Sequence, residues 1–569
     1  MTTLLRQPLA IALSLVLAAC AAPAQTPSTG DVPREQQPPS APKRVVIAAQ
    51  GDAQVFYFDM QVTLPSDDHL EELVNRGLSE ADPTGVFRPV MAETMPSIDA
   101  GSWKLLADGR METTWRIKPN ARWQDGAPYT SADVAFTMKA AMDPELPLRQ
   151  RPVYASIDRV EAPDPLTVTV IWSRPFIDAD SFFSRELVLP LPRHLLEKAV
   201  TEDKASFANL PYWTDEFIGT GPFRVREFEA GSRIVLQAND LYVLGRPNVD
   251  EIEIAIIPDP NAQMAAVLAG TVDLVLGRGV NADRASVLEE QWKEGRVDTR
   301  ISGSTVIYTQ FMGASPAGVT DVQFRRALLM GIDRQQIADV LVEGRTPVAH
   351  MFIGPNEPEY KDIENAVVRY DYDPRRAAQL IEGLGHRKGP DGLLRDGANQ
   401  RLAIEVRSDP GETEQKSSLA VADAWRQLGV DVDTVVIPTQ RARDLEYLFT
   451  YPAFQLRGHS SRIRSGFLNY SSKESPLPEN RWAGGNRGRY SNPELDVAID
   501  RYFVTIPRTE RTQVLQTAVR IISDQIPVLT LFYTPQFAVI ANRVENMQPS
   551  KASGTSSKTW DAQAWDVRR

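Results

Sequence analysis

The sequence predicts a mixed α/β fold. Runs of β-branched residues alternate with helical periodicity from about residue 230 to residue 440, which favours layers of helices and sheets over an all-β architecture. The chain has 569 residues, of which 42% are apolar and 24% are charged, and this is the composition of a globular protein. Its length allows three or four domains of about 150 residues, or fewer large ones with substantial cores.

Strands are expected where β-branched and apolar residues run together. The first, 44–49, ends at Gly51-Asp52, where turn residues break it. Further strands are expected at 111–117, 166–172, 232–237, 252–257, 272–276, 404–407 and 432–437.

Helices are expected where apolar residues recur with the helical period. Thr320 and Gly344 are placed to begin and to end the helix expected at 321–342. The other expected helices are 262–269, 374–384, 414–428 and 508–526.

Residues 107–145 predict a hairpin that leads into a helix. Residues 111–117 alternate as a strand, and Asp125-Gly126 fits a tight turn. Thr130 precedes Asp133 by three residues, which is similar to a capping box, with Asp in place of the better Glu.

Cys20 is the only cysteine and ends an apolar N-terminal segment. Arg6 precedes the apolar residues 9–16, which are too few for a typical membrane span. The stretch LAAC (17–20) resembles a bacterial lipobox, in which the cysteine sulfur receives a diacylglyceryl group. The alternative is an ordinary signal peptide followed by a chance cysteine. Because the thiol occurs nowhere else, we predict a lipoprotein signal peptide at 1–19 and lipidation at Cys20.

Residues 20–42 are expected to form a disordered tether. Six prolines stand within 21–42, which has no aromatic residue and one valine as its only large apolar side chain. Such a segment cannot bury a core. We therefore expect an exported protein that is tied to a membrane by its N-terminus.

Composition and motifs exclude several classes of protein. The net charge of −12 repels phosphate backbones, so we expect no nucleic-acid partner. A single cysteine excludes an intramolecular disulfide and a cysteine-based zinc site, and the five histidines lack H-E-x-x-H and H-x-H spacing. The motifs G-x-x-x-x-G-K-S/T and G-x-S-x-G are absent. We therefore expect no enzyme, no metal and no cofactor.

Several sequence blocks resemble the family 5 solute-binding proteins, the oligopeptide- and dipeptide-type receptors of ATP-binding-cassette (ABC) importers. The family pattern aromatic-x-Leu/Ile-Lys/Arg, Trp/Phe-x-Asp-Gly, Thr-x-x-Asp-Val is matched by WRIK (115–118), WQDG (123–126) and TSADV (130–134). The further matching blocks, in the family's order, are GTGPF (219–223), DVQFRRALLMGIDRQQI (321–337), YDYDPRRAAQLI (370–381) and YSNPELDVAID (490–500).

The resemblance implies the two-lobe, periplasmic-binding-protein-like α/β fold (type II, large cluster with an extra sub-lobe), connected by a hinge. The hinge would lie at the chain crossings 301–305 and 527–531. The implied parts are lobe I at 43–302 plus 527–569, its sub-lobe at about 90–215, and lobe II at 303–526.

The resemblance also implies that the protein binds a ligand and catalyses no reaction. The chain would be an extracytoplasmic substrate-binding lipoprotein at the cell membrane, a monomer that binds a peptide or peptide-like solute between its lobes. It would deliver this solute to the permease subunits of an ABC importer. The alternatives are a receptor for an opine, an oligosaccharide or a metal chelate, a lipoprotein chaperone or sensor, and a secreted hydrolase.

Ligand-binding candidates follow from position. Gln50 and Asp52 follow the first strand, and such a strand end commonly faces the cleft. Further candidates, each of which core packing explains equally well, are Tyr308 and Gln310 after the first crossing, and the aromatic residues Trp482 and Tyr533.

One segment departs from the family's peptide receptors. Those receptors use a lobe II aspartate for the ammonium group of the ligand. The corresponding residues here, 454–470, contain no acid, and His459 or Ser460 stands where the aspartate is expected.

The same region is strongly basic. Residues 455–490 contain six arginines, among them Arg457 and Arg462, and one lysine against two glutamates, a net charge of +5. Guanidinium groups suit carboxylate or phosphate, so one hypothesis is a ligand with an anionic end. The alternative is that several of these arginines lie on a solvated loop around 484–485 and pair with acids of lobe I.

Overall fold

The computed structural model describes residues 41–51, 55–60, 70–277, 279–548 and 557–568. The predicted lipidation residue Cys20 and the candidate Asp52 lie outside the described residues. Pro42–Arg569 form one compact unit. Within the described ranges, no helix combines the length and the apolar character needed to cross a bilayer.

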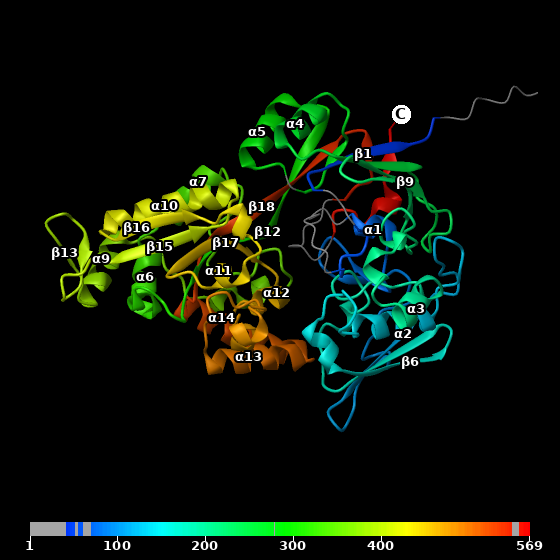
Figure 1. Cartoon of the computed structure of the whole chain (residues 1–569), viewed down its shortest axis with the longest axis horizontal. Helices are drawn as coiled ribbons and strands as arrows, with labels where there is room; N and C mark the ends of the chain where they lie inside the picture. Colours follow the sequence, from blue (N-terminus) through cyan, green and yellow to red (C-terminus); the bar gives the residue numbers. More distant parts are fainter. Residues whose placement is uncertain (1–40, 52–54, 61–69, 278, 549–556, 569) are drawn as a thin grey trace, which may run out of the picture. The chain divides into compact units, whose positions relative to one another are not determined.

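A ten-stranded mixed sheet runs through the described part of the chain (Figure 1). Strands from the middle of the sequence lie on one side of β12 and β18, and the other strands lie on the opposite side. In spatial order the strands are β16 (Asp431–Val436), β15 (Ala403–Ser408), β17 (Phe454–Ser460), β12 (Gly295–Thr309), β18 (Val528–Ala541), β11 (Leu274–Val275), β1 (Arg44–Ala49), β10 (Glu251–Ile256), β9 (Arg233–Ala238) and β8 (Phe223–Glu229).

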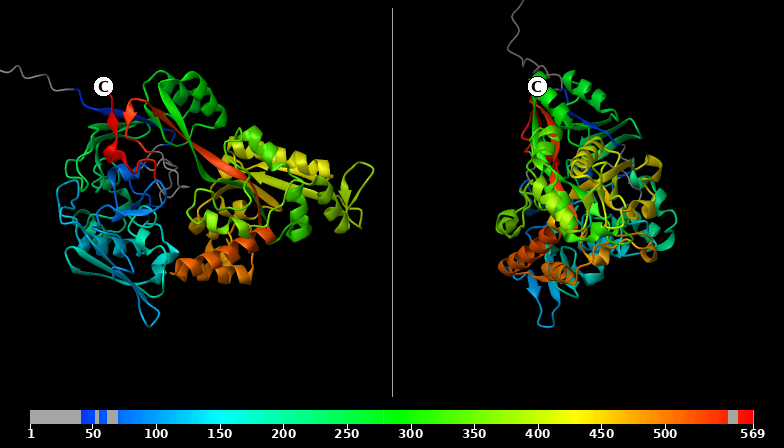
Figure 2. Two further views of the ribbon diagram at one scale, coloured as in Figure 1. Left: turned by 180° about the vertical axis from the view of Figure 1, so that it is seen from behind. Right: turned by 90° about the vertical axis from the view of Figure 1, so that its left-hand side faces the viewer.

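The two long strands β12 and β18 join these two groups of strands. They have 15 and 14 residues and pair antiparallel, from Gly295 opposite Ala541 to Tyr308 opposite Val528. Figures 1 and 2 show them side by side between the groups. The pairing register shifts twice near the middle of β12, after Ile301 and after Thr305. Such shifts locally disrupt the ladder and bend a strand.

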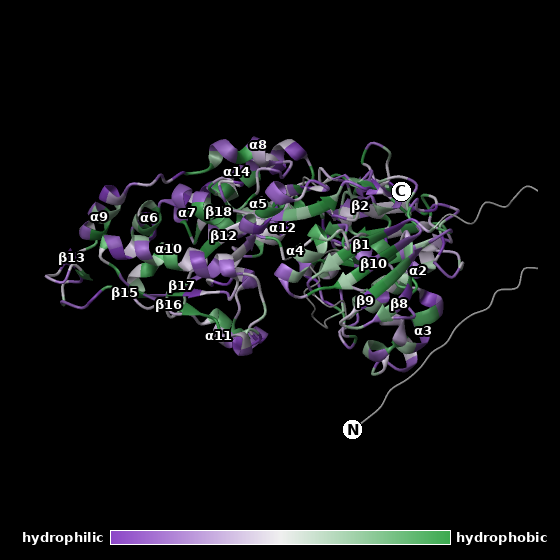
Figure 3. Cartoon of the chain, turned by 90° about the horizontal axis from the view of Figure 1, so that it is seen from above, coloured by the Kyte–Doolittle hydropathy of each residue, from purple (hydrophilic) through white to green (hydrophobic). Residues whose placement is uncertain are grey.

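Each group of strands has its own hydrophobic packing. Ile252 of β10 belongs to a core built from the N-terminal part and the C-terminus. In the other group, Leu456 packs with Trp425 on one face of the sheet, and Tyr308 packs with Phe352 on the other face. Figure 3 shows green apolar residues along the strands and purple hydrophilic residues on the loops and outer helix turns. The alternation of side chains along the strands produces this segregation.

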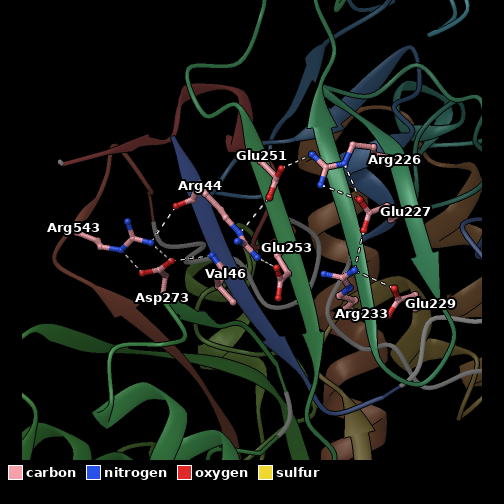
Figure 4. A network of polar contacts seen from close by, with 10 residues as sticks. All are labelled: Arg44, Val46, Arg226, Glu227, Glu229, Arg233, Glu251, Glu253, Asp273 and Arg543. Carbon is pink, nitrogen blue, oxygen red and sulfur yellow. Dashed lines mark hydrogen bonds and ion pairs between the residues drawn. The ribbon is translucent and has the colours of Figure 1, made fainter. Parts of the chain in front are cut away.

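A ladder of ion pairs covers the polar face of β1, β8, β9 and β10 (Figure 4). Glu251 and Glu253 flank the buried Ile252 in β10 and therefore point to the opposite face. Arg44 lies 3.3 Å from Glu251 and also pairs with Glu253, and Arg226 lies 2.5 Å from Glu251. Partly exposed pairs of this kind contribute about 0–1 kcal/mol each, so the ladder mainly keeps this face polar.

A four-stranded antiparallel sheet and α2 (Ser131–Ala141) follow the expected local pattern. The Asp133 carboxylate accepts the Thr130 backbone N–H at 2.9 Å, which confirms the capping box. Gly126 has a φ of +92° in the expected turn. The strand before this turn pairs with β4 and β7 instead of folding back across it. The strands are β4 (Trp103–Leu105), β5 (Met111–Arg116), β7 (Thr167–Trp172) and β6 (Ile157–Asp164).

The remaining elements are helices and short strand pairs. The helices are α1 (Glu71–Val74), α3 (Arg193–Glu202), α4 (Pro260–Leu268), α5 (Ala282–Gln291), α6 (Val322–Met330), α7 (Arg334–Leu341), α8 (Tyr360–Ile363), α9 (Pro374–Gly383), α10 (Glu412–Leu428), α11 (Leu445–Phe449), α12 (Ile463–Phe467), α13 (Pro493–Val504) and α14 (Arg508–Gln525). The short strands are β2 (Ser79–Ala81), β3 (Phe87–Pro89), β13 (Arg387–Lys388), β14 (Leu394–Arg395), β19 (Val544–Glu545) and β20 (Asp566–Val567).

The expectation of one helix at 321–342 is wrong, because two helices, α6 and α7, occupy this stretch. The Asp333 side chain accepts the backbone N–H of Gln336 and so starts a second helix. Asp321, not Thr320, caps the first helix through the N–H of Gln323.

The GTGPF block packs tightly against the backbone at the end of α1. A Cβ atom on Gly221 would lie 2.4 Å from the carbonyl carbon of Val74 and 2.6 Å from the nitrogen of Asn75. Between the two glycines, the Thr220 hydroxyl accepts the Arg76 N–H at 2.9 Å. Only glycine fits at position 221, so this turn has a packing role.

Gly221→Ala is expected to lower the free energy of unfolding by ~1–3 kcal/mol, because backbone atoms must move to admit the methyl group. Chemical denaturation measures this change. Gly397→Ala is the matched control, since a Cβ there meets no atom within 4 Å. Equal stability of the two variants would contradict the packing role of Gly221.

Candidate ligand-binding site

A cavity of about 410 Å³ lies along the crossing strands. Arg300 of β12 and Gln536 of β18 face each other in the antiparallel ladder and both line it. The other lining residues are Asp298, Thr299, Ile301, Arg345, Thr346, Asn356, Ala538, Ile540, Met547, Gln548 and Lys558. A concave site with a few convergent polar groups is typical of ligand binding.

Arg300 is held rigidly at this cavity. Its Nε and Nη2 atoms donate to the Gln536 Oε1 at 3.0 Å and 2.8 Å. Burial, followed by the nearby positive charge of Arg185, lowers the pKa of Arg300 to about 10. The guanidinium remains charged at neutral pH, in surroundings where water no longer stabilises it fully.

Two further guanidinium groups stack on one exposed ring. The Arg149 and Arg185 groups lie 4.6 Å and 5.0 Å from the ring centroid of Phe58, whose side chain is 43% exposed. The backbone N–H of Phe58 donates to Glu71 Oε1 at 2.9 Å, which holds the ring in place. Cation–π contacts of this kind contribute about 0.5–1 kcal/mol at exposed sites.

The acids near this ring do not balance its cations at neutral pH. Burial raises the pKa of Glu71 to about 8, against the opposing charge of Arg185. Glu71 is therefore mostly protonated at pH 7. Asp59 is already paired with Arg151 at 2.5 Å, although burial raises the pKa of Asp59 as well.

The basic segment 455–490 contacts acids of the N-terminal part. Arg462 pairs with Glu186, and Arg464 lies 3.1 Å from Asp178. Burial, followed by the charges of Arg464 and Arg185, lowers the pKa of Arg462 to about 10. The charge of Arg185 thus contributes to the lowered pKa of both Arg300 and Arg462.

The sequence of the chain was compared with models of known protein families. Residues 94–463 match the model of the bacterial extracellular solute-binding proteins, family 5 Middle. The chain belongs to this family.

Relatives of this family 5 protein match it along most of their length. The oligopeptide-binding protein AppA of Bacillus subtilis is 23% identical over 490 residues, 82% of this chain and 85% of that protein. The structure of AppA with a nonapeptide has a TM-score of 0.71 at 20% identity, covering 93% of this chain and 100% of that one. NikA of Brucella suis, solved with Fe(III)-EDTA, has a TM-score of 0.75 at 17% identity, covering 92% of this chain and 100% of that one. These likenesses confirm the α/β solute-binding-protein fold.

Four of the predicted ligand residues of the family 5 protein are buried and bonded within the protein. Tyr308 Oη lies 2.6 Å from His459 Nδ1, and burial lowers the pKa of His459 to about 3. The Gln310 amide donates to Phe449 O at 3.0 Å. The Tyr533 hydroxyl donates to the carbonyl oxygens at 351 and 353. Their role in ligand binding stays a prediction.

The other predicted residues also have partners within the protein. Gln50 donates to Pro258 O at 3.0 Å, and Ser460 lies 2.6 Å from Ser465. Arg457 lies 3.1 Å from Asp409. Trp482 is partly exposed and 6.0 Å below the guanidinium of Arg489.

Sequence reasoning did not single out Arg300 and Gln536, which line the cavity. The one sequence signal for Arg300 was its position next to the expected hinge crossing at 301–305. Within the described residues, no group of three His, Cys, Asp or Glu side chains is arranged to hold a metal ion.

The buried His459 predicts a pH-dependent stability. Its pKa falls from 6.5 to about 3 on folding, so below pH 6.5 the unfolded chain binds a proton that the folded protein does not. Between pH 6 and pH 4 the free energy of unfolding is expected to fall more steeply than in His459→Gln, by up to about 1.4 kcal/mol per pH unit. Urea denaturation at each pH measures both slopes. Parallel curves would contradict the neutral, buried state of His459.

Proposed function

We propose that the chain is the extracytoplasmic substrate-binding lipoprotein of an ABC importer. It binds a peptide or peptide-like solute in the cavity along β12 and β18 and delivers it to the permease subunits of the importer, as a monomer. The observation that carries this proposal is the position of the cavity, beside the strands that join the two groups. The name of AppA as an oligopeptide-binding protein supports a peptide solute.

In this proposal the two groups of strands belong to two lobes that close on the solute. Lobe I comprises 43–302 and 527–569, with a sub-lobe at about 90–215, and lobe II comprises 303–526. The register shifts after Ile301 and Thr305 support a hinge there, because irregular pairing makes a strand easier to bend. Closure needs contacts that exist only in the closed form. The solute supplies them, and the protein performs no chemistry.

Cys20 and the tether complete the proposal. The two acyl chains of a diacylglyceryl group on the Cys20 sulfur keep the receptor at the membrane, where its permease lies. Residues 20–42, rich in proline, then serve as a tether between the lipid and the folded part.

A second candidate solute is a non-peptide such as a metal chelate, an opine or an oligosaccharide. NikA of Brucella suis, whose structure was solved in complex with Fe(III)-EDTA, provides a precedent for a chelate in this fold.

Native mass spectrometry of the protein purified from its host is expected to find a peptide or peptide-like solute bound. Adding this solute to protein freed of it by unfolding and refolding should stabilise the fold by ~2.7 kcal/mol at a concentration 100 times Kd. Calorimetric melting measures the effect. A protein that retains no solute and responds to none of a broad peptide panel would contradict the proposal.

Cys20→Ser is expected to release the protein from the membrane fraction of the host, because serine lacks the thiol that forms the thioether. Fractionation with immunodetection measures this. The wild-type chain, expressed at the same level, is the control. Equal membrane association of both proteins would contradict lipidation at Cys20.

A further inference from the structure

Two stretches of the chain that belong to different proposed lobes meet outside the cavity along β12 and β18. Residues 176–186 of the proposed sub-lobe contact residues 462–464 and 503–506 of the proposed lobe II, and these contacts are called the latch below. None of the described residues that line the cavity belongs to the latch. The latch can therefore act on closure of the lobes without touching a solute in that cavity.

Two ion pairs cross the latch. Arg462 pairs with Glu186, and Arg464 lies 3.1 Å from Asp178. The Arg464 guanidinium also lies 5.0 Å from the ring centroid of Phe176. All four charged side chains are partly buried, so salt and water screen these pairs less than they screen a pair on the open surface.

Apolar side chains of each lobe pack against the other lobe. Ile177 packs against the core of lobe II that contains Phe352, and Ile506 packs against the core of the sub-lobe that contains Trp172. The backbone N–H of Ile177 donates to the carbonyl oxygen of Phe503 at 3.2 Å. The latch thus combines apolar burial, a backbone hydrogen bond and ion pairs.

The latch is packed less tightly than either core. One cavity of about 150 Å³ and another of about 130 Å³ flank it, and Arg464 and Phe503 line both cavities. Ion pairs and unfilled space are typical of contacts between domains that form and break, whereas the core of a domain is close-packed. The latch can therefore open while each lobe stays folded.

Arg464 offsets an excess of acids in the larger of these two cavities. The charged lining residues are Asp178 and Glu186 from the sub-lobe, and Glu357, Glu359, Arg462 and Arg464 from lobe II. Burial raises the pKa of Glu359, and the charge of Asp178 adds to this rise. Loss of the Arg464 charge would leave repulsion between acids of the two lobes.

We propose that the latch stabilises the closed form of the receptor, so that Arg464 and Asp178 set the affinity for solutes that they do not touch. The inference rests on the proposed function, because it assigns these contacts to closure of the two lobes. Contacts that exist only in the closed form shift the equilibrium toward it, with or without a solute. They add to the contacts that the solute supplies. Arg462, a predicted ligand residue, then serves closure through Glu186.

Arg464→Asp tests the latch, because it places a carboxylate opposite Asp178. In protein freed of solute by unfolding and refolding, the ratio of closed to open molecules is expected to fall about tenfold or more, since facing like charges repel. Small-angle X-ray scattering measures this change as a larger radius of gyration. The charge swap that combines Asp178→Arg with Arg464→Asp is expected to restore the wild-type radius.

Arg326→Asp is the matched control. Arg326 pairs with Asp524 at 2.6 Å and lies 5.7 Å from the ring centroid of Tyr370, and all three residues belong to the proposed lobe II. The control variant loses the same kinds of contact within one lobe, so it is expected to keep the wild-type radius of gyration. Circular dichroism checks that each variant is folded.

Solute affinity gives a second readout. Isothermal calorimetry with Ala-Ala-Ala and Glu-Ala-Glu is expected to show that Arg464→Asp weakens binding of both tripeptides by the same factor, about tenfold. A smaller closed population lowers the apparent affinity for every solute equally. A larger loss for Glu-Ala-Glu than for Ala-Ala-Ala would place Arg464 at the solute and overturn the inference.

The outcomes separate the latch from the receptor proposal. An unchanged radius in Arg464→Asp, an equal increase in Arg326→Asp, or no recovery in the charge swap would overturn the inference and leave the receptor proposal standing. A radius that rises in Arg464→Asp and recovers in the charge swap, in a protein that binds no peptide of a broad panel, would support the latch and contradict the receptor proposal.

Discussion

The antiparallel pairing of β12 with β18 is the constraint on which the rest of the structure depends. The chain passes between the two groups of strands through these two strands. Each group has its own hydrophobic core, and the paired strands connect the two groups in one continuous sheet. The same ladder sets Arg300 opposite Gln536 and so creates the polar wall of the cavity. Its register shifts lie within a few residues of that wall. A bend in β12 and β18 would therefore move the residues that line the cavity.

Two buried guanidinium groups, those of Arg300 and Arg462, are a second feature of this part of the structure. Burial lowers the pKa of Arg300 and of Arg462 to about 10, and the positive charge of Arg185 contributes to both shifts. Gln536 orients Arg300 through two hydrogen bonds, and Glu186 pairs with Arg462.

Local patterns in the sequence predicted the elements well and the site poorly. The strand at 44–49 and the helix start at Thr130 depend on neighbouring residues, and both are found as expected. The break between α6 and α7 was missed because the helical spacing of apolar residues continues across it. The break itself comes from Asp333, whose side chain caps the start of α7. Arg300 and Gln536 meet only through the tertiary fold, so no spacing in the sequence connects them. The candidates Tyr308 and His459 have the right residue types for ligand contact, yet they bond to each other inside the core.

Hinge closure can be measured most directly as a distance between the two groups of elements. Spin labels at Leu195→Cys on α3 and Leu419→Cys on α10, both exposed positions, can be placed in a Cys20→Ser background. Pulsed electron paramagnetic resonance is expected to give a distribution of distances between the two labels that shifts and narrows when the solute binds. An unchanged distribution, with calorimetry showing the solute bound to the same labelled protein, would contradict a clamp that closes about β12 and β18.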